Sequence, residues 1–291
     1  MESSAFRTPD GVAVPAVTAE EMRDVDRVAV EEVGLTLPRM MEHAGRALAR
    51  QALDTRPSAD DDPVIVLAGG GGNGGGGLVC ARHLSNRGIP TTVVLDRPST
   101  DMTGVPGEQL AILEHTDANV TSGDTDVTGG DTDGSVTSGD TDVTSGDTDA
   151  DVTGGDTDVT GGDTDGSGID GDELPTPSLV VDALLGYGLR GAPQGRAATL
   201  VEWTGSVAAP VLSLDVPSGV DATTGETPGT AVRPELTLTL ALPKTGLVGR
   251  PEDLVLADLS IPVSVYDRLD IPPVAPFGDA FRVSLAGAHS A

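Results

Sequence analysis

The sequence predicts an α/β fold in which a mainly parallel β-sheet is covered by helices on both faces. Short apolar runs alternate with longer amphipathic segments along the chain, and turns rich in glycine or proline separate them. The length of 291 residues exceeds one average domain and falls short of three. Only six residues are aromatic, so Val, Leu, Ile and Ala must build the core.

The expected helices and strands follow one another along the chain. Thr18 and Glu21 form a capping-box pattern, which predicts a helix that runs to about residue 33. A second helix is expected over residues 38–53, with proline at its first position. The apolar run 63–68 predicts a buried strand that leads into a glycine-rich turn. Further elements are expected as helices at 78–86, 107–115 and 194–205, and as strands at 91–96, 179–183, 211–215, 236–242 and 254–257.

The strongly acidic composition argues against several classes of partner. Acidic residues outnumber basic ones 46 to 17, for a net charge of −29, which disfavours binding to nucleic acid or to an anionic membrane. Residues 120–173 hold 16 of the acids and no base, so the rest of the chain still carries −13. Molar salt would screen that excess, and we therefore expect a halophilic, archaeal source, with an acidic protein from a mesophile as the alternative.

The acidic segment 120–173 is an internal repeat. The tetrapeptide Gly-Asp-Thr-Asp begins at residues 123, 130, 139, 146, 155 and 162, so that the full unit spans 16 residues. The repeat offers only isolated Val residues and hence no stackable apolar face. We expect a disordered, solvated insertion, with weak cation binding as the alternative.

The location of the protein follows from what the sequence lacks. No apolar run approaches the roughly 18 residues of a membrane span, and the first residues contain no apolar stretch typical of a signal peptide. A single cysteine, Cys80, excludes an intrachain disulfide and is expected to be a packing residue. The sequence therefore predicts a cytoplasmic protein.

Three strand ends carry residues suited to a ligand, which in open α/β sheets binds at the carboxyl ends of strands. The first leads into residues 69–77, eight glycines around Asn73 whose bare backbone suits phosphate. This run holds a G-x-G-x-x-G match, and Asp96 ends the next strand, as in dinucleotide-binding folds. The other two strands end at Asp182 and Asp215. Each feature has a structural alternative, namely a flexible turn, a cap acid or a turn residue.

Taken together, the motifs resemble the NAD(P)H-hydrate epimerase family, which is defined by a YjeF N-terminal-type domain. The resemblance covers about residues 18–262 apart from the insertion. The matching stretches, in order, are residues 41–45 (Met-Glu-His-Ala-Gly), the glycine run with 77–84, 181–186, 215–219 with 224–225, and 237–246. The resemblance implies a three-layer α/β/α Rossmann-like sandwich, with the epimerase domain at 18–265 and tails at 1–17 and 266–291.

The activity that the resemblance implies is an isomerase reaction of nicotinamide nucleotide repair. Members of the family interconvert the R and S epimers of NADH and NADPH hydrated at C6. The implied partner is an ADP- or ATP-dependent NAD(P)H-hydrate dehydratase, which this chain is too short to hold as a second domain. The resemblance also implies a homodimer.

The resemblance assigns ligands to the three strand ends. It places a potassium ion on Asn73, Asp182 and Ser218, whose oxygen atoms suit a hard cation. Gly72 and Gly76 depart from the Asn and Asp that are usual in the family. Substrate contacts are implied for Gly72, Asn73, Gly74, Gly75, Gly76, Gly186, Tyr187, Gly188, Leu189, Arg190, Gly191, Ala192 and Asp215.

Asp215 and Lys244 are the expected catalytic residues. Asp215 would protonate the leaving C6 hydroxyl and then activate water, while Lys244 would tune its charge. Lys244 could instead be a solvated strand-end lysine, and Tyr187 is a candidate to stack on a ring. The four histidines show no ligand spacing. Two other functions stay open: a nicotinamide-dependent dehydrogenase, and a catalytically silent interaction module of the same fold.

Overall fold

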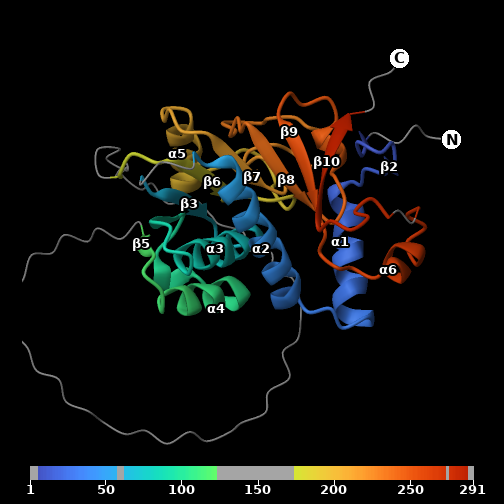
Figure 1. The fold of residues 1–291 in the computed structure, drawn as a ribbon, viewed down its shortest axis with the longest axis horizontal. Helices are drawn as coiled ribbons and strands as arrows, with labels where there is room; N and C mark the ends of the chain where they lie inside the picture. The colour runs from blue at the N-terminus through green and yellow to red at the C-terminus, as the bar shows by residue number, and fades with distance from the viewer. Residues whose placement is uncertain (1–5, 58–61, 123–173, 273–274, 288–291) are drawn as a thin grey trace, which may run out of the picture. The chain divides into compact units, whose positions relative to one another are not determined.

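The computed structural model describes residues 6–57, 62–122, 174–272 and 275–287 of the chain. Within these residues ten strands form one sheet, in the spatial order β2-β1-β10-β9-β8-β7-β6-β3-β4-β5 (Figure 1). Most of the acidic segment 120–173 lies outside the described residues, so the prediction of a disordered, solvated insertion stays a prediction.

Seven neighbouring strands of the sheet run parallel, and three further strands extend it antiparallel at one edge. The parallel strands are β3 (Val64–Ala68), β4 (Thr91–Leu95), β5 (Asn119–Thr121), β6 (Leu179–Ala183), β7 (Val211–Leu214), β8 (Leu236–Leu240) and β9 (Asp253–Ala257). The antiparallel strands are β10 (Arg282–Gly287), β1 (Phe6–Arg7) and β2 (Ala13–Val14). The predicted mainly parallel sheet is thus confirmed.

The helices connect the strands and cover the sheet. They are α1 (Ala19–Arg27), α2 (Leu37–Thr55), α3 (Gly72–Ser85), α4 (Gly104–Leu113), α5 (Gly195–Thr204) and α6 (Val263–Asp267), with a π-helical turn η1 (Val28–Glu32) and 3₁₀ turns η2 (Ser99–Asp101) and η3 (Thr245–Leu247). The capping box at the start of α1 is present, since Thr18 Oγ1 accepts from the Glu21 N–H and Glu21 accepts from the Thr18 N–H. None of the described helices combines the length and apolarity that crossing a bilayer requires.

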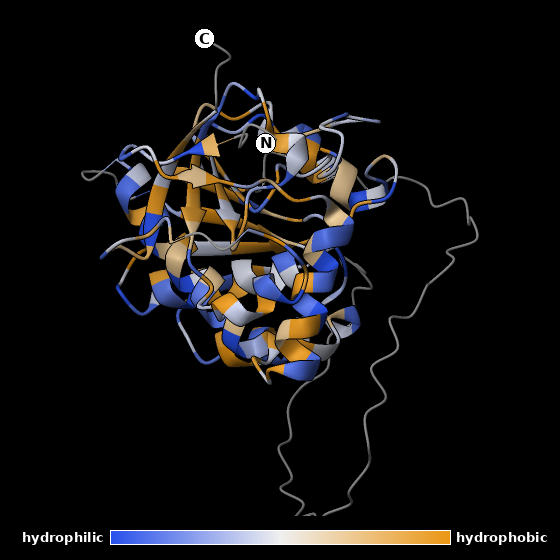
Figure 2. Ribbon diagram, turned by 90° about the vertical axis from the view of Figure 1, so that its right-hand side faces the viewer, coloured by the Kyte–Doolittle hydropathy of each residue, from blue (hydrophilic) through white to orange (hydrophobic). Residues whose placement is uncertain are grey.

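Alternate side chains of the central strands pack on different helices. In β3, Val64 and Val66 belong to an apolar cluster with α2, α3 and α4, whereas Ile65 and Leu67 belong to a cluster with α5. Because successive side chains of a strand point to opposite faces, these helices cover opposite faces of the sheet. Figure 2 shows the apolar strands lying among the helices, and a strand buried on both faces explains the unbroken apolar run.

The order of the strands reverses at β3. The chain runs outward from β3 to β4 and β5, returns to place β6 on the other side of β3, and then continues to β7, β8 and β9. The register aligns Ala68 with Ala183, so β3 and β6 end level with each other. The connections leave these two ends in opposite directions, which opens a crevice suited to a ligand.

The glycine run is helical, in contrast to the predicted turn before a helix at residue 78. Helix α3 already begins at Gly72. A Cβ atom on Gly74 would collide with the carbonyl oxygen of Gly69, and one on Gly77 would lie 2.7 Å from the Cβ atom of Ala183 in β6. Each helical glycine costs roughly 1 kcal/mol against alanine. Because these glycines carry no Cβ atoms, α3 can pack closely on the sheet.

Three segments that are predicted as tails or insertion supply strands to the sheet. Residues 1–17 and 266–291 are predicted as tails, yet they supply β1, β2 and β10, which cover the edge of β9. The predicted insertion begins at residue 120, yet Val120 and Thr121 pair with β4. These pairings join segments far apart in the chain, and such short strands carry little periodicity of their own.

Candidate active site

A cavity of about 670 Å³ lies at the crevice between the ends of β3 and β6. The first turn of α3, the loop after β6 and the end of β7 line it from the sheet, and α1 and α2 line it from the other side. This volume falls within the roughly 300–1,000 Å³ that is typical of small-molecule sites. The three strand ends singled out in the sequence therefore meet at one place.

Asp215 follows directly after β7 and lines this cavity in a left-handed backbone conformation, with φ of +68°. Such a φ is uncommon outside glycine, although Asp and Asn tolerate it better than other residues. Strand β8 holds the turn in place, because the Asp215 N–H donates to the Leu238 carbonyl at 2.7 Å and the Leu240 N–H donates to Asp215 Oδ1 at 3.2 Å. Strained residues that the surrounding structure fixes are common at active sites.

Lys244, the only lysine of the chain, is fully buried beside Asp215. Its Nζ atom donates to Asp215 Oδ1, to the Leu240 carbonyl at 3.0 Å and to the Leu242 carbonyl at 3.1 Å. These three bonds use all three N–H groups of the ammonium. The reading of Lys244 as a solvated strand-end lysine is therefore wrong.

Asn73 ties α3 to the ends of two strands. Its Nδ2 donates to the carbonyl of Leu185 at 3.0 Å and to the carbonyl of Leu214 at 2.9 Å. Because one carbonyl follows β6 and the other ends β7, the amide fixes the start of α3 above both strand ends. The single asparagine among the eight glycines thus has two specific backbone hydrogen-bond partners.

Asp182 is completely buried in β6 and accepts four hydrogen bonds. Its donors are the Ser213 hydroxyl at 2.7 Å, the Ser218 N–H at 2.9 Å, the Ser218 hydroxyl at 2.5 Å and the Leu184 N–H at 3.3 Å. Burial raises the pKa of Asp182 above its ordinary value, and the bonds from Ser218 oppose that shift. Asp182 therefore anchors the loop that carries Ser218.

The donor set around Asn73 suits a monovalent cation by its chemistry. The Oδ1 atom of Asn73 accepts no hydrogen bond from the described residues, and the carbonyls of Leu185 and Leu214 and the Ser218 hydroxyl are the kind of oxygen ligands that a hard cation prefers. Asp182 already has four donors on its two oxygens, so it would supply negative charge without an open lone pair. Within the described ranges, no three His, Cys, Asp or Glu side chains gather as they would around zinc.

A second carboxylate reaches the cavity from α1. Asp26 accepts a hydrogen bond from the Tyr187 hydroxyl, and both residues line the cavity with Asp215 and Lys244. The Lys244 Nζ atom lies 5.8 Å from the centre of the Tyr187 ring. Burial raises the pKa of Asp26, while the bond from Tyr187 and the charge of Lys244 act in the opposite direction. Burial also raises the pKa of Tyr187, and the charge of Asp26 adds to that shift.

The structure brings most of the predicted site residues together. Those that line the cavity are Gly72, Asn73, Gly186, Tyr187, Gly188, Leu189, Arg190, Asp215 and Lys244. Gly74, Gly75, Gly76, Gly191 and Ala192 do not line the cavity, and the substrate contacts expected there stay predictions. Gly74, Gly75 and Gly76 pack closely against Gly69, Met41 and Leu214, respectively.

Asp96 also lines the cavity, but a neighbour occupies both of its oxygens. Arg97 donates from Nε to Oδ1 at 2.8 Å and from a terminal nitrogen to Oδ2 at 3.2 Å. The dinucleotide fingerprint needs this acid for a ribose hydroxyl. Each oxygen of Asp96 keeps a second acceptor site beside its bond from Arg97, so this pairing does not decide for or against the nicotinamide-dependent dehydrogenase.

Sequence reasoning missed Asp26, although a signal for it exists. Met22 and Ala29 are buried on the apolar face of the first helical segment, and Asp26 falls on the same face four residues after Met22. A carboxylate on the apolar face of an amphipathic helix breaks the pattern of that face. Because it becomes buried there, it needs a hydrogen-bond or ion-pair partner. Cys80 is buried in the main apolar cluster, as expected for a packing residue.

Known proteins resemble the chain over nearly its full length. The family described as YjeF-related protein N-terminus matches residues 38–246. The NAD(P)H-hydrate epimerase of Dehalogenimonas lykanthroporepellens is 40% identical over 288 residues, which is 98% of each chain. The bifunctional NAD(P)H-hydrate repair enzyme Nnr of Salinibacter ruber is 33% identical over 89% of this chain, which spans only 43% of that relative.

The fold agrees with these sequence matches. The crystal structure of yeast ynu0 superposes with a TM-score of 0.70 at 20% identity, covering 93% of this chain and all of that one. The family match extends from α2 to η3 and so includes β3, α3, β6, β7 and Lys244, the parts that build the cavity. The chain therefore belongs to the YjeF-related protein N-terminus family, as the resemblance in its motifs predicts.

Proposed function

We propose that the protein is an NAD(P)H-hydrate epimerase, which interconverts the C6 epimers of hydrated NADH and NADPH. One observation carries the proposal. Asp215 is fixed by a buried ion pair with Lys244, and its Oδ2 accepts no hydrogen bond from the described residues, although Asp215 lines the cavity. The family membership and the name of the Dehalogenimonas relative support the choice of substrate.

Epimerisation at C6 requires a hydroxyl to leave and water to return to the opposite face of the ring. The lone pair of the adjacent ring nitrogen expels the hydroxyl, which takes up a proton and departs as water. A planar iminium ion is left behind. Water then attacks the other face, forms a new C–O bond and gives up a proton, so the reaction neither oxidises nor reduces the nucleotide.

Two carboxyl groups in different surroundings can divide this proton transfer. Burial raises the pKa of Asp26, which favours its protonated form and makes it the proposed donor to the leaving hydroxyl. Asp215 is ion-paired with Lys244 and is the proposed acceptor of a proton from the attacking water. Lys244 has all its N–H groups engaged, so it positions Asp215 and does not itself touch the substrate.

The same cavity holds the groups that would bind the nucleotide. The first turn of α3 presents backbone N–H groups that lack partners within the helix and attract phosphate. Arg190 and the glycines of the loop after β6 face the cavity across from it. We assign these groups to the phosphates of the substrate and the surface near Tyr187 and Asp215 to its nicotinamide ring.

A potassium ion is part of this proposal. Asn73, Ser218 and the carbonyls of Leu185 and Leu214 would hold it, with the charge of Asp182 nearby. When bound, the ion supplies positive charge that offsets the phosphates of the nucleotide.

The role we propose is the repair of damaged nicotinamide nucleotides in the cytoplasm. A dehydratase that accepts one epimer can restore the coenzyme from both only if the epimers interconvert. The name of the Salinibacter relative joins two functions in one repair enzyme, of which this chain spans a part. The partner that we propose is an ADP- or ATP-dependent NAD(P)H-hydrate dehydratase.

The proposal is tested by incubating the protein with a single purified C6 epimer of hydrated NADH and following the epimer ratio by chromatography. We expect the ratio to approach equilibrium faster than in a matched sample without protein. A catalytically silent module would leave the rate unchanged. The variant Asp215→Asn serves as the control for catalysis by a contaminant, because it should be inactive after identical purification.

A further inference from the structure

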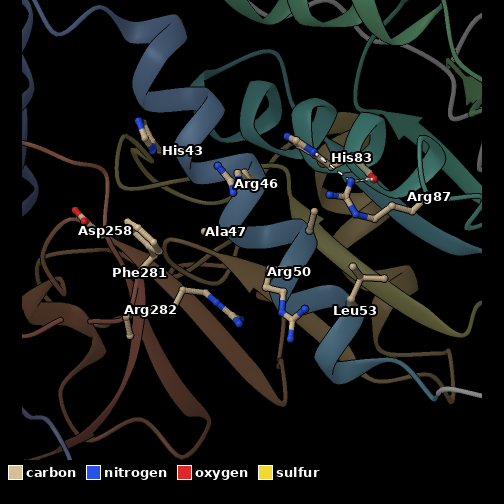
Figure 3. Close-up of a pocket in the computed structure, with 12 residues that line it drawn as sticks. His43, Arg46, Ala47, Arg50, Leu53, His83, Arg87, Asp258, Phe281 and Arg282 are labelled. Carbon is tan, nitrogen blue, oxygen red and sulfur yellow. Dashed lines mark hydrogen bonds between the residues drawn. The ribbon is translucent and has the colours of Figure 1, made fainter. Parts of the chain in front are cut away.

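A second cavity, of about 460 Å³, is lined by residues of α2, α3 and the start of β10 (Figure 3). It shares no lining residue with the cavity at Asp215. In Figure 3 the side chains of Arg50 from α2 and Arg282 from β10 reach toward the same space, with Phe281 at the side. Nothing in the proposed reaction uses these residues.

The walls of this cavity are strongly basic. Four of the 16 arginines of the chain line it, together with two histidines and a single carboxylate, Asp258. The lining arginines are Arg46, Arg50, Arg87 and Arg282. In a chain with a net charge of −29, these arginines create a local positive potential on an otherwise acidic protein.

The protein around them neutralises the arginines only in part. Arg50 and Arg282 share one carboxylate, that of Asp54, at 3.1 and 2.8 Å. Arg87 donates to the His83 carbonyl at 2.6 Å, which supplies no negative charge. Arg46 makes no hydrogen bond or ion pair with any residue that the structure describes. Asp54 joins Arg50 and Arg282, whereas Arg46 and Arg87 have no carboxylate partner among the described residues, so an added anion would relieve the repulsion between the remaining charges.

The chemistry of the site selects the anion. A guanidinium group presents paired donors that match the oxygens of phosphate. Phe281 is 79% exposed at the wall of the cavity, and so its ring is available to stack on a planar group. An exposed aromatic ring beside several arginines suits a ligand with both a base and phosphates. The volume lies within the range of small-molecule sites.

We infer that this cavity is a second ligand site, which binds a nucleotide through its phosphates to Arg46 and the neighbouring arginines and through its base to Phe281. The site is independent of the cavity at Asp215, and the inference does not depend on the proposed epimerase activity. ADP and inorganic pyrophosphate are the probes that separate its two halves, because they share a diphosphate and differ in the base.

The test is isothermal titration of the full chain with ADP and with pyrophosphate at one fixed salt concentration. The variants are Arg46→Gln and Phe281→Ser, and the control is Arg233→Gln, which removes the same charge from an exposed arginine outside both cavities. Arg46→Gln should weaken both ligands at least about tenfold, since it removes charged hydrogen bonds. Phe281→Ser should weaken ADP at least about fivefold and leave pyrophosphate unchanged.

Each contrary outcome overturns the inference. ADP binding that is insensitive to Arg46→Gln would place the nucleotide elsewhere, for instance in the cavity at Asp215. Equal weakening of ADP and pyrophosphate in Phe281→Ser would remove the stacking role. If the wild type binds neither probe and Arg46→Gln instead changes its oligomeric state in analytical ultracentrifugation, the arginines belong to a protein interface. Thermal midpoints equal to that of the control variant show that the substitutions leave the fold intact.

Discussion

The ammonium of Lys244 binds one oxygen of the Asp215 carboxylate, and the other oxygen accepts no hydrogen bond from the described residues, although Asp215 lines the cavity. The pair is almost completely shielded from solvent, with side-chain exposures of 1% and 3%. Two backbone carbonyls complete the coordination of the ammonium. The geometry therefore turns Asp215 into a group with one anchored and one available oxygen, which suits proton transfer to a bound ligand.

The substitution Asp215→Asn should abolish epimerisation, and it should also lower the stability of the protein because the buried Lys244 ammonium loses its counter-charge. The amide keeps an oxygen that can accept from Lys244, and Asn tolerates the left-handed φ of +68° at this position. It cannot carry a proton, so we expect a fall in rate of about 100- to 10,000-fold. Rates of epimer equilibration at saturating substrate measure this. Asp253→Asn, in an exposed position of β9, is the matched control and should keep the wild-type rate.

The substitution Lys244→Met should destabilise the protein strongly at neutral pH. It leaves the Asp215 carboxylate buried without its counter-charge, a loss of about 3–5 kcal/mol for pairs of this kind. Denaturant unfolding measures the free energy. The double variant Asp215→Asn/Lys244→Met should recover much of that stability because no charge is then left unpaired. A double variant as unstable as Lys244→Met would show that the lysine acts through packing alone.

Asp26 should make the stability of the protein depend on pH. Burial raises its pKa in the folded state, so its contribution to stability is full below the ordinary Asp pKa and is lost as the pH rises through the raised value. The substitution Asp26→Asn removes this loss of stability, because the amide side chain does not ionise as the pH rises. We expect the thermal midpoint of the variant to rise relative to wild type as the pH increases from about 4. A difference in thermal midpoint between variant and wild type that stays constant at every pH would contradict the raised pKa of Asp26.

Potassium should stabilise the wild type through Asn73. A cation that binds the folded state alone raises the thermal midpoint by mass action. We expect potassium chloride to raise it more than choline chloride at equal ionic strength, and Asn73→Ala to lose that difference. The variant also removes two hydrogen bonds, to the carbonyls of Leu185 and Leu214, so its midpoint in choline chloride is the reference. A potassium effect that survives in Asn73→Ala would place the ion elsewhere or make it unspecific.

Two glycines at the start of α3 should respond to alanine with opposite signs. At Gly72 a Cβ atom would meet nothing within 4 Å, so Gly72→Ala should be neutral or stabilising by up to about 1 kcal/mol. At Gly74 a Cβ atom would collide with the Gly69 carbonyl, which is backbone and cannot move aside. Gly74→Ala should therefore destabilise by about 1–3 kcal/mol or more. Urea unfolding gives the free energy of unfolding of both variants. Equal changes at the two positions would contradict the close packing of Gly74 against the Gly69 carbonyl.

The sequence alone carried the signals that place the parallel part of the sheet and most of the cavity. Residues 64–68 and 179–183 are mainly apolar runs that form buried strands. A strand with one face in solvent would alternate apolar and polar residues, whereas a strand covered on both faces does not. Asn73, Asp182 and Asp215 stood out as polar residues at strand ends, and parallel strands bring such ends to one edge of the sheet.

Only the tertiary structure decided which groups meet there and which do not. The turn that carries Lys244 pairs with Val17, just ahead of α1, and Asp26 lines the cavity from α1, whose apolar face shares a hydrophobic cluster with β9. The glycine run is helical because the sheet leaves α3 no room for Cβ atoms. The basic cavity draws its arginines from α2, from the turn after α3 and from β10. The first and the last lie more than 200 residues apart in sequence, and no local pattern brings such residues together.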